Sequence, residues 1–192
     1  MKKIFFIAIS MMLMIGTASA QIKEDVQKSQ VRATELQKLC DDYKTCGNGN
    51  IDDYGNAVKA AAIFAISNSK QLETLYQRQI GETKDGVTDV TIKKPTLIEW
   101  SNLATTVAGE TLSIKTATDK AQAAVKEAKD ISEMATKEKN PMKVANAAKQ
   151  AKLASAIVSF GNGATPILLD ESAAQAKAIK SIIDTLKSGK NL

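Results

Sequence analysis

The chain has 192 residues, of which 44% are hydrophobic and 4% aromatic, and it carries a formal net charge of +5 without a single histidine. This length is enough for one domain with a core of its own. Histidine is the most common general acid–base residue and metal ligand, and the lysines are interleaved with acids instead of forming the basic stripe of a nucleic-acid-binding protein. We therefore predict no enzymatic activity, no cofactor, no metal site and no nucleic-acid partner.

The first twenty residues have the pattern of a cleaved secretory signal peptide. Lys2 and Lys3 precede an apolar run over residues 4–15, and small residues follow up to Ala20. The run has about 12 residues, fewer than the roughly 20 needed to span a bilayer. We predict cleavage between Ala20 and Gln21 and a periplasmic or secreted protein, with an uncleaved anchor as the alternative. The mature domain, residues 21–192, loses two lysines and no acid, so its net charge is +3.

The mature sequence predicts helix almost throughout, because alanine and long unbranched side chains dominate and prolines are few. Apolar residues recur at spacings of three and four, as one buried helix face requires. The fold class is all-α, an elongated antiparallel bundle of about five helices, one of them long, with one long loop at residues 81–95. The five expected helices cover residues 22–40, 52–80, 96–139, 140–160 and 165–188.

Helix ends are marked by residues that favour caps and turns. An aspartate at 52 or 53 is expected to cap the second helix, and Gly81 to end it. Thr96 and Glu99 have the spacing of a capping box, and Pro141 suits the first turn of the fourth helix. Glycines at 161 and 163 are expected to end that helix, and Thr165 with Pro166 to begin a fifth. Asp170 and Glu171 then fall in its first turns, where the helix dipole favours acids.

The two cysteines, Cys40 and Cys46, are predicted to form a disulfide, because the signal peptide directs the chain to an oxidising compartment. Residues six apart in a helix are separated by about 9 Å along the axis, too far for a disulfide. The bond therefore requires the first helix to end between them. A structural staple fits this spacing better than a redox role, for which Cys-x-x-Cys is typical.

Two segments are candidate partner contacts. Residues 60–66 form an uninterrupted apolar run in the second helix, which indicates either burial on all sides or a surface awaiting a partner. Residues 81–95 form a long insert, compatible with one short strand, and long loops inside compact domains are often functional. The side chains singled out in these segments are Phe64, Ile66, Val87, Val90 and Ile92.

The charged residues can be explained as a solvated surface or as a binding surface. Lysines along residues 115–152 alternate with acids, as on a solvated helix face, although a membrane-surface or partner-docking face is the alternative. The loop Asn48, Asn50, Asp52 has the alternate spacing of a calcium loop, but the match fails at Asp53 and Lys59. No set of side chains is therefore predicted to bind a cofactor or metal.

These observations predict an exported, non-enzymatic helical bundle that acts through contacts with another cell-envelope or extracellular protein. The alternative is a membrane-active bundle, lipid-binding or pore-forming, that opens and inserts its apolar run. A carboxylate- or lysine-based enzyme is a third, weaker hypothesis. It would need acids that gather in a concave pocket in three dimensions.

Overall fold

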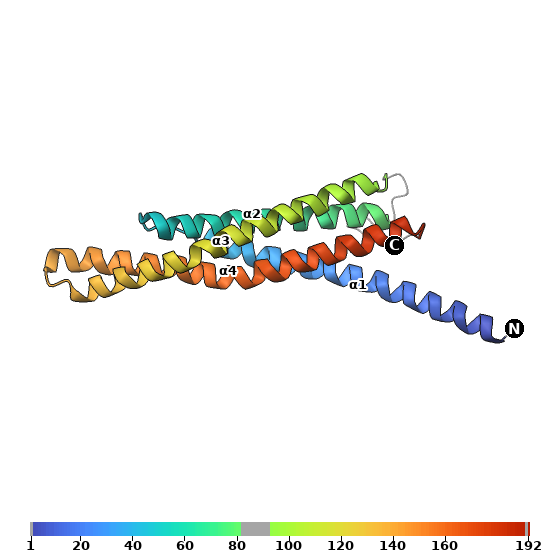
Figure 1. The fold of residues 1–192 in the computed structure, drawn as a ribbon, viewed down its shortest axis with the longest axis horizontal. Coiled ribbons are helices and arrows are strands. Elements are labelled where there is room, and N and C mark those ends of the chain that lie inside the picture. Colours follow the sequence, from blue (N-terminus) through green and yellow to red (C-terminus); the bar gives the residue numbers. More distant parts are fainter. Residues whose placement is uncertain (1, 82–92, 191) are drawn as a thin grey trace.

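The protein is an elongated, all-helical bundle in the computed structural model, which describes residues 2–81, 93–190 and 192, with side chains from Ala20 onward (Figure 1). The helices run alternately up and down the long axis, as predicted. The described residues hold four helices and no strand, so the expected number of five is wrong. The helices are α1 (Lys2–Asp41), α2 (Gly49–Ile80), α3 (Leu97–Lys137) and α4 (Pro141–Lys187).

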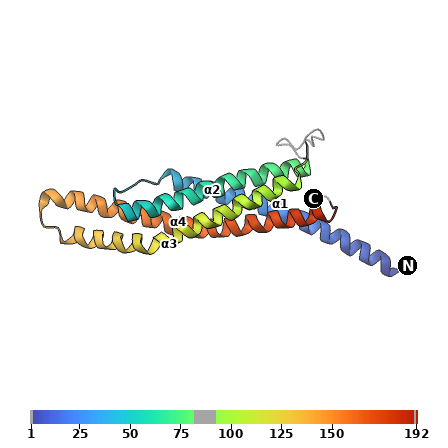
Figure 2. The ribbon, with the colours of Figure 1, turned by 45° about the horizontal axis from the view of Figure 1, so that its top comes forward.

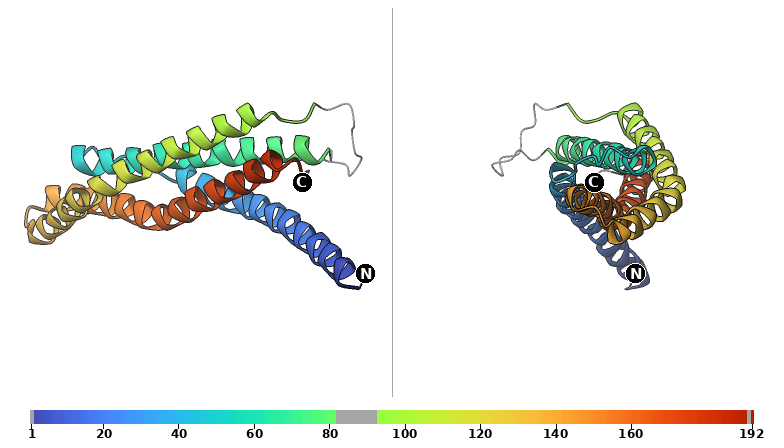
Figure 3. Two further views of the ribbon diagram at one scale, coloured as in Figure 1. Left: turned by 45° about the vertical axis from the view of Figure 1, so that its right-hand side comes forward. Right: turned by 90° about the vertical axis from the view of Figure 1, so that its left-hand side faces the viewer.

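Each helix packs against the next along the chain, and α4 closes the bundle by also contacting α1 and α2. The views in Figures 2 and 3 agree on two overhanging ends. The first part of α1 extends past the other helices beside the C-terminus. At the opposite end, α3 and α4 extend as a pair beyond the first turn of α2 (Figure 1).

Most predicted helix boundaries are confirmed. Gly81 ends α2 in the left-handed conformation at φ 77°, and its amide donates to the Gln77 carbonyl. Thr96 and Glu99 form both hydrogen bonds of a capping box at the start of α3. Asn140 caps α4 and Pro141 occupies its first turn. These features depend only on residues a few positions apart, which is why the sequence reveals them.

The predicted cap of α2 is wrong. Asn48 caps this helix, its side-chain oxygen accepting from the Ile51 amide at 3.4 Å. Asp52 lies inside the first turn, and its carboxylate accepts from the backbone amides of Cys46 and Gly47 at 2.7 and 2.8 Å. The aspartate therefore holds the preceding loop in place.

Helices four and five of the prediction are one continuous helix, α4, which runs through Gly161, Gly163 and Pro166. Packing explains the difference. A Cβ atom on Gly161 would lie 2.1 Å from the Tyr54 hydroxyl oxygen, so this glycine makes room for a side chain of α2. Ala164 is fully buried on the next turn, and its burial favours the helix over a break. Similarly, α3 is unbroken through Gly109.

The core consists of two apolar clusters stacked along the bundle axis. The larger is centred on the end that holds the α1–α2 loop and includes Leu36, Ile51 and Ile157. The smaller lies toward the C-terminus and includes Ile22, Leu72 and the only tryptophan, Trp100. Alanines are frequent in the larger cluster, so its helices approach closely while each residue buries little area.

Candidate functional site

A layer of mostly buried polar side chains separates the two apolar clusters. On every helix its members fall in sequence between the residues of one cluster and those of the other. All four helices contribute, so the layer crosses the whole bundle. Its members, called the polar layer below, are the buried Ser29, Asn68, Ser69, Glu110, Glu171, Ser172 and Gln175, with the partly buried Arg32 and the exposed Thr111, which hydrogen-bond to Glu171 and Ser172.

Glu171 is the charged centre of the polar layer and is fully buried. The Arg32 guanidinium donates to one carboxylate oxygen at 2.5 Å, and Gln175 donates to the other at 2.5 Å. The Ser29 hydroxyl also donates to Glu171, and therefore accepts from Ser69, whose oxygen lies 2.8 Å away. A buried carboxylate is tolerated when it is paired and hydrogen-bonded in this way.

Glu110, on α3, is the second buried carboxyl of the layer. One of its oxygens accepts from the Asn68 amide at 2.7 Å, and the other has no hydrogen-bond partner among the described residues. Burial raises the pKa of Glu110 to about 7, the Asn68 hydrogen bond opposes this, and the negative charge of Glu171 adds to it. Near neutral pH the group is therefore close to half protonated.

The polar layer was missed from the sequence, although a signal was present. Glu110 lies three residues after Val107 and four before Ile114, so a carboxyl stands where the apolar stripe of α3 calls for an apolar residue. The sequence predicts Glu171 in the first turns of a fifth helix. It lies instead in the interior of α4, where its side chain turns inward, while Asp170 is exposed.

The chemistry of the polar layer is that of a register lock. Glu110 and Glu171 are closed to solvent at 0% exposure. In the described part of the chain, no group of three or more Cys, Asp or Glu side chains has the arrangement of a metal site. Sliding a helix by one turn would separate Arg32 from Glu171 and Asn68 from Glu110, and such a slip is costly because it leaves buried charges unpaired.

The predicted disulfide is wrong, because Cys40 and Cys46 are free thiols in the structure. Helix α1 does end between them, after Asp41. Both side chains are buried in the larger apolar cluster, at 3% and 4% exposure, and burial raises the pKa of both thiols. They pack as small apolar groups, while hydrogen bonds to Asp52 hold the loop.

Two side chains of the calcium-like loop share one partner, and the third has others. Asn48 and Asn50 each donate a side-chain amide to the Glu127 carboxylate at 2.8 Å. These bonds fasten the start of α2 to α3. Asp52 is engaged with backbone amides, as described above, so the three side chains do not converge on one point.

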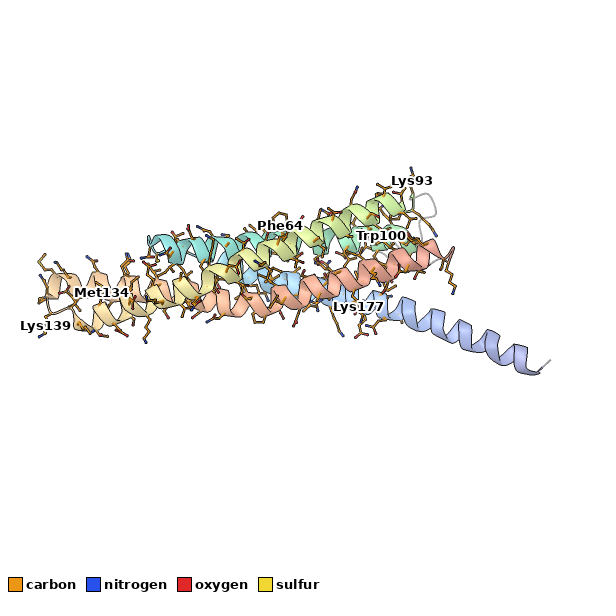
Figure 4. All side chains as sticks on the ribbon, viewed as in Figure 1. Phe64, Lys93, Trp100, Met134, Lys139 and Lys177 are labelled. Atoms are coloured by element: carbon orange, nitrogen blue, oxygen red, sulfur yellow. The ribbon has the colours of Figure 1, made fainter. Side chains whose placement is uncertain are left out.

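The apolar run at residues 60–66 divides between the core and the surface. Ile66 is 8% exposed and packs in the larger cluster, so it offers no contact surface in the closed bundle. Ile63 and Phe64 point outward at 56% and 47% exposure, and Figure 4 shows Phe64 on the outer side of α2. Three other candidates, Val87, Val90 and Ile92, lie outside the described residues.

A surface groove of about 420 Å³ continues the stripe of α2 that carries Phe64. Ser67, Gln71 and Thr74 follow Phe64 at helical spacings of three, four and three, so they share its face. The opposite wall belongs to α3. The residues that line the two walls of the groove are Ser67, Lys70, Gln71, Thr74, Leu75, Glu99, Asn102, Leu103 and Thr106. Ile63, Phe64 and this lining are called the α2–α3 surface below.

The ends of the 81–95 loop are fastened beside this groove. Arg78 donates to the Lys93 carbonyl at 3.1 and 3.2 Å and to the Glu99 carboxylate at 2.7 Å. These contacts tie the last turn of α2 to the first turn of α3. The groove is therefore built on two helices whose ends are held together.

Among the described residues, no helix contains an apolar stretch long enough to cross a membrane. Comparison with protein-family models, with curated proteins and with solved structures finds no match to this chain.

Proposed function

We propose that the protein is an exported, non-enzymatic helical bundle that acts through protein–protein contacts in the periplasm or outside the cell. The observation that carries this proposal is the α2–α3 surface, in which two large apolar side chains lie exposed beside a groove. Exposed aromatic side chains next to pockets are frequent anchors of protein interfaces. The groove walls offer hydroxyl, amide and charged groups for the polar rim of such a contact.

The export part of the proposal is supported by where the core begins. Ala20 and Gln21 are exposed, and Ile22, one residue later, is 3% exposed in the smaller apolar cluster. The ribbon of α1 before this point projects away from the other helices (Figure 3). Cleavage after Ala20 would therefore remove the projecting segment and leave the described core intact.

The alternative, a membrane-active bundle that inserts its apolar run, requires the bundle to open. Ala61, Ala62 and Ala65 are each 0% exposed, so they can reach lipid only if α2 leaves the other helices. Insertion would also pull Asn68 and Ser69 out of the polar layer. Release of dye from loaded vesicles at micromolar protein would favour this alternative over the closed bundle.

The proposed contact is tested by site-specific photo-crosslinking in intact cells of the organism that produces the protein. A crosslinker at Phe64 is expected to give one specific protein adduct, and the matched control is Val31, an apolar residue of α1 that is 59% exposed. Phe64→Ser combined with Ile63→Ser should abolish capture by a tagged protein, while Val31→Ser should not. Equal adducts at 64 and 31, or none at 64, would refute the α2–α3 surface as the contact.

A further inference from the structure

The paired end of α3 and α4 is the least covered part of the bundle. The start of α2 reaches α3 at Glu127, through the side-chain amides of Asn48 and Asn50. Beyond that point α3 and α4 continue as a two-helix arm, residues 128–152, in which no residue is buried. At 1.5 Å per residue the arm is about 15–20 Å long. Figure 1 shows it projecting beyond α2.

The arm is cationic. It contains six lysines and three acids, a net charge of +3, whereas the remaining mature residues balance to zero. On the α4 side there is no acid at all between Glu138 and Asp170. Lys139, Lys143 and Lys149 are exposed and form no salt bridge with a carboxylate of the described residues. This half of the arm is therefore a surface of uncompensated positive charge.

The tip of the arm also exposes large apolar side chains. Met134, near the end of α3, is 71% exposed and Met142, in the first turn of α4, is 87% exposed. Met134 and Lys139 both lie at the extreme end of the molecule in Figure 4. Methionine is unbranched and flexible, so it adapts to an irregular or fluid environment. Apolar side chains beside long lysines are the combination used at lipid interfaces.

We propose that the tip of the arm binds a membrane surface rich in anionic lipids. Met134 and Met142 enter the boundary between headgroups and acyl chains, while Lys139 and Lys143 contact the lipid phosphates. A second copy of the chain is disfavoured as the occupant, because two tips of the same charge repel each other. A narrow projecting tip suits an extended planar surface, and the rest of the bundle then stands away from the membrane.

This proposal is independent of the α2–α3 surface, which lies on a different part of the bundle. It also requires no opening of the helices, because every side chain it uses is already exposed. The lipid contact would hold the protein at the membrane while the α2–α3 surface stays free.

The test is vesicle flotation with the purified mature chain. One set of vesicles contains phosphatidylcholine alone, and the other contains phosphatidylcholine and phosphatidylglycerol in equal amounts. We expect the protein to float with the anionic vesicles only, and to be released by added salt. Lys139→Glu with Lys143→Glu should lower the partition coefficient at least about twenty-five-fold, since each lysine near an anionic surface contributes about fivefold.

The matched control is Lys177→Glu with Lys187→Glu, which makes the same change in net charge on the distant half of α4 (Figure 4). This variant should retain most of the binding. Met134→Ser with Met142→Ser should also weaken flotation, whereas Val31→Ser should not. Circular dichroism of each variant checks that the exposed substitutions leave the helices intact.

The outcomes are distinct. Equal losses in the tip and control lysine variants would mean that only net charge matters, and would overturn the proposal. Flotation with neutral vesicles to the same extent, or no flotation with either set, would overturn it as well. Loss confined to the tip variants supports it, whatever the crosslinking at Phe64 shows.

Discussion

Replacing Glu110 by glutamine should stabilise the protein above neutral pH and leave it unchanged in acid. The carboxyl has an ordinary pKa of 4.5, which burial raises to about 7 in the bundle. A group whose pKa is raised by folding binds its proton more tightly in the folded state. The free energy of unfolding is therefore highest below about pH 4.5, where Glu110 is protonated in both states. It falls as the pH rises from there through about 7.

The size of this effect follows from the two pKa values. The difference between 4.5 and about 7 corresponds to about 3 kcal/mol of lost stability once Glu110 is fully ionised. Between about pH 5 and pH 8 the loss is about 2–3 kcal/mol. The chain has no histidine, so few other side chains titrate in this window. A glutamine stays neutral, and its oxygen can still accept from Asn68, which donates to Glu110 at 2.7 Å.

The assay is urea unfolding at several pH values, followed by the fluorescence of Trp100, which is fully buried in the native bundle. Glu110→Gln should exceed the parent by about 2–3 kcal/mol at about pH 8, or roughly 4–12 °C in melting temperature for a domain of this size, and approach it at about pH 4, below the unfolded pKa. Glu133→Gln, at a carboxylate that is 52% exposed, is the control and should change little. Parallel stability–pH curves for parent and Glu110→Gln would refute the reasoning.

Further substitutions test the packing and the caps. Gly161→Ala should destabilise by about 1–3 kcal/mol, because its Cβ would meet the Tyr54 hydroxyl at 2.1 Å, whereas Gly163→Ala, whose nearest neighbour is 4.0 Å away, should be neutral or stabilising by up to about 1 kcal/mol in urea unfolding. Pro166→Ala should raise the melting temperature, since it restores a helix hydrogen bond at an exposed site and relieves a cost of up to about 3 kcal/mol; an unchanged melting temperature would contradict this. Thr96→Ala should cost about 1 kcal/mol by removing the side-chain half of the α3 capping box, and a Thr96→Ser variant that unfolds like the parent would show that the hydroxyl is responsible.

The candidate contact region was only partly foreseeable from the sequence. The apolar run at 60–66 stood out by composition, but periodicity could not say which members face the core. Ile66 and Phe64 are two positions apart, about 200° around a helix, so one of them had to turn inward. The position of α1 and α4 against α2 decided that Ile66 is buried and Phe64 exposed.

The sequence by itself determined the all-helical class and most of the helix ends. Capping boxes, left-handed glycines and first-turn prolines act between residues a few positions apart, so their effect is the same in any fold. The stripes of apolar residues likewise determined that the helices must pack together.

Only the tertiary structure decided the features that join residues distant in the chain. The contact of Tyr54 with Gly161 and the burial of Ala164 carry α4 through two glycines and a proline that would end an isolated helix. The pairing of Arg32 with Glu171, 139 positions apart, turns an apparent helix-start acid into the centre of a polar layer. Cys40 and Cys46 are held in place by burial in the larger apolar cluster and not by a disulfide between them. In each case the free energy of long-range packing outweighs a local preference of about 1–3 kcal/mol.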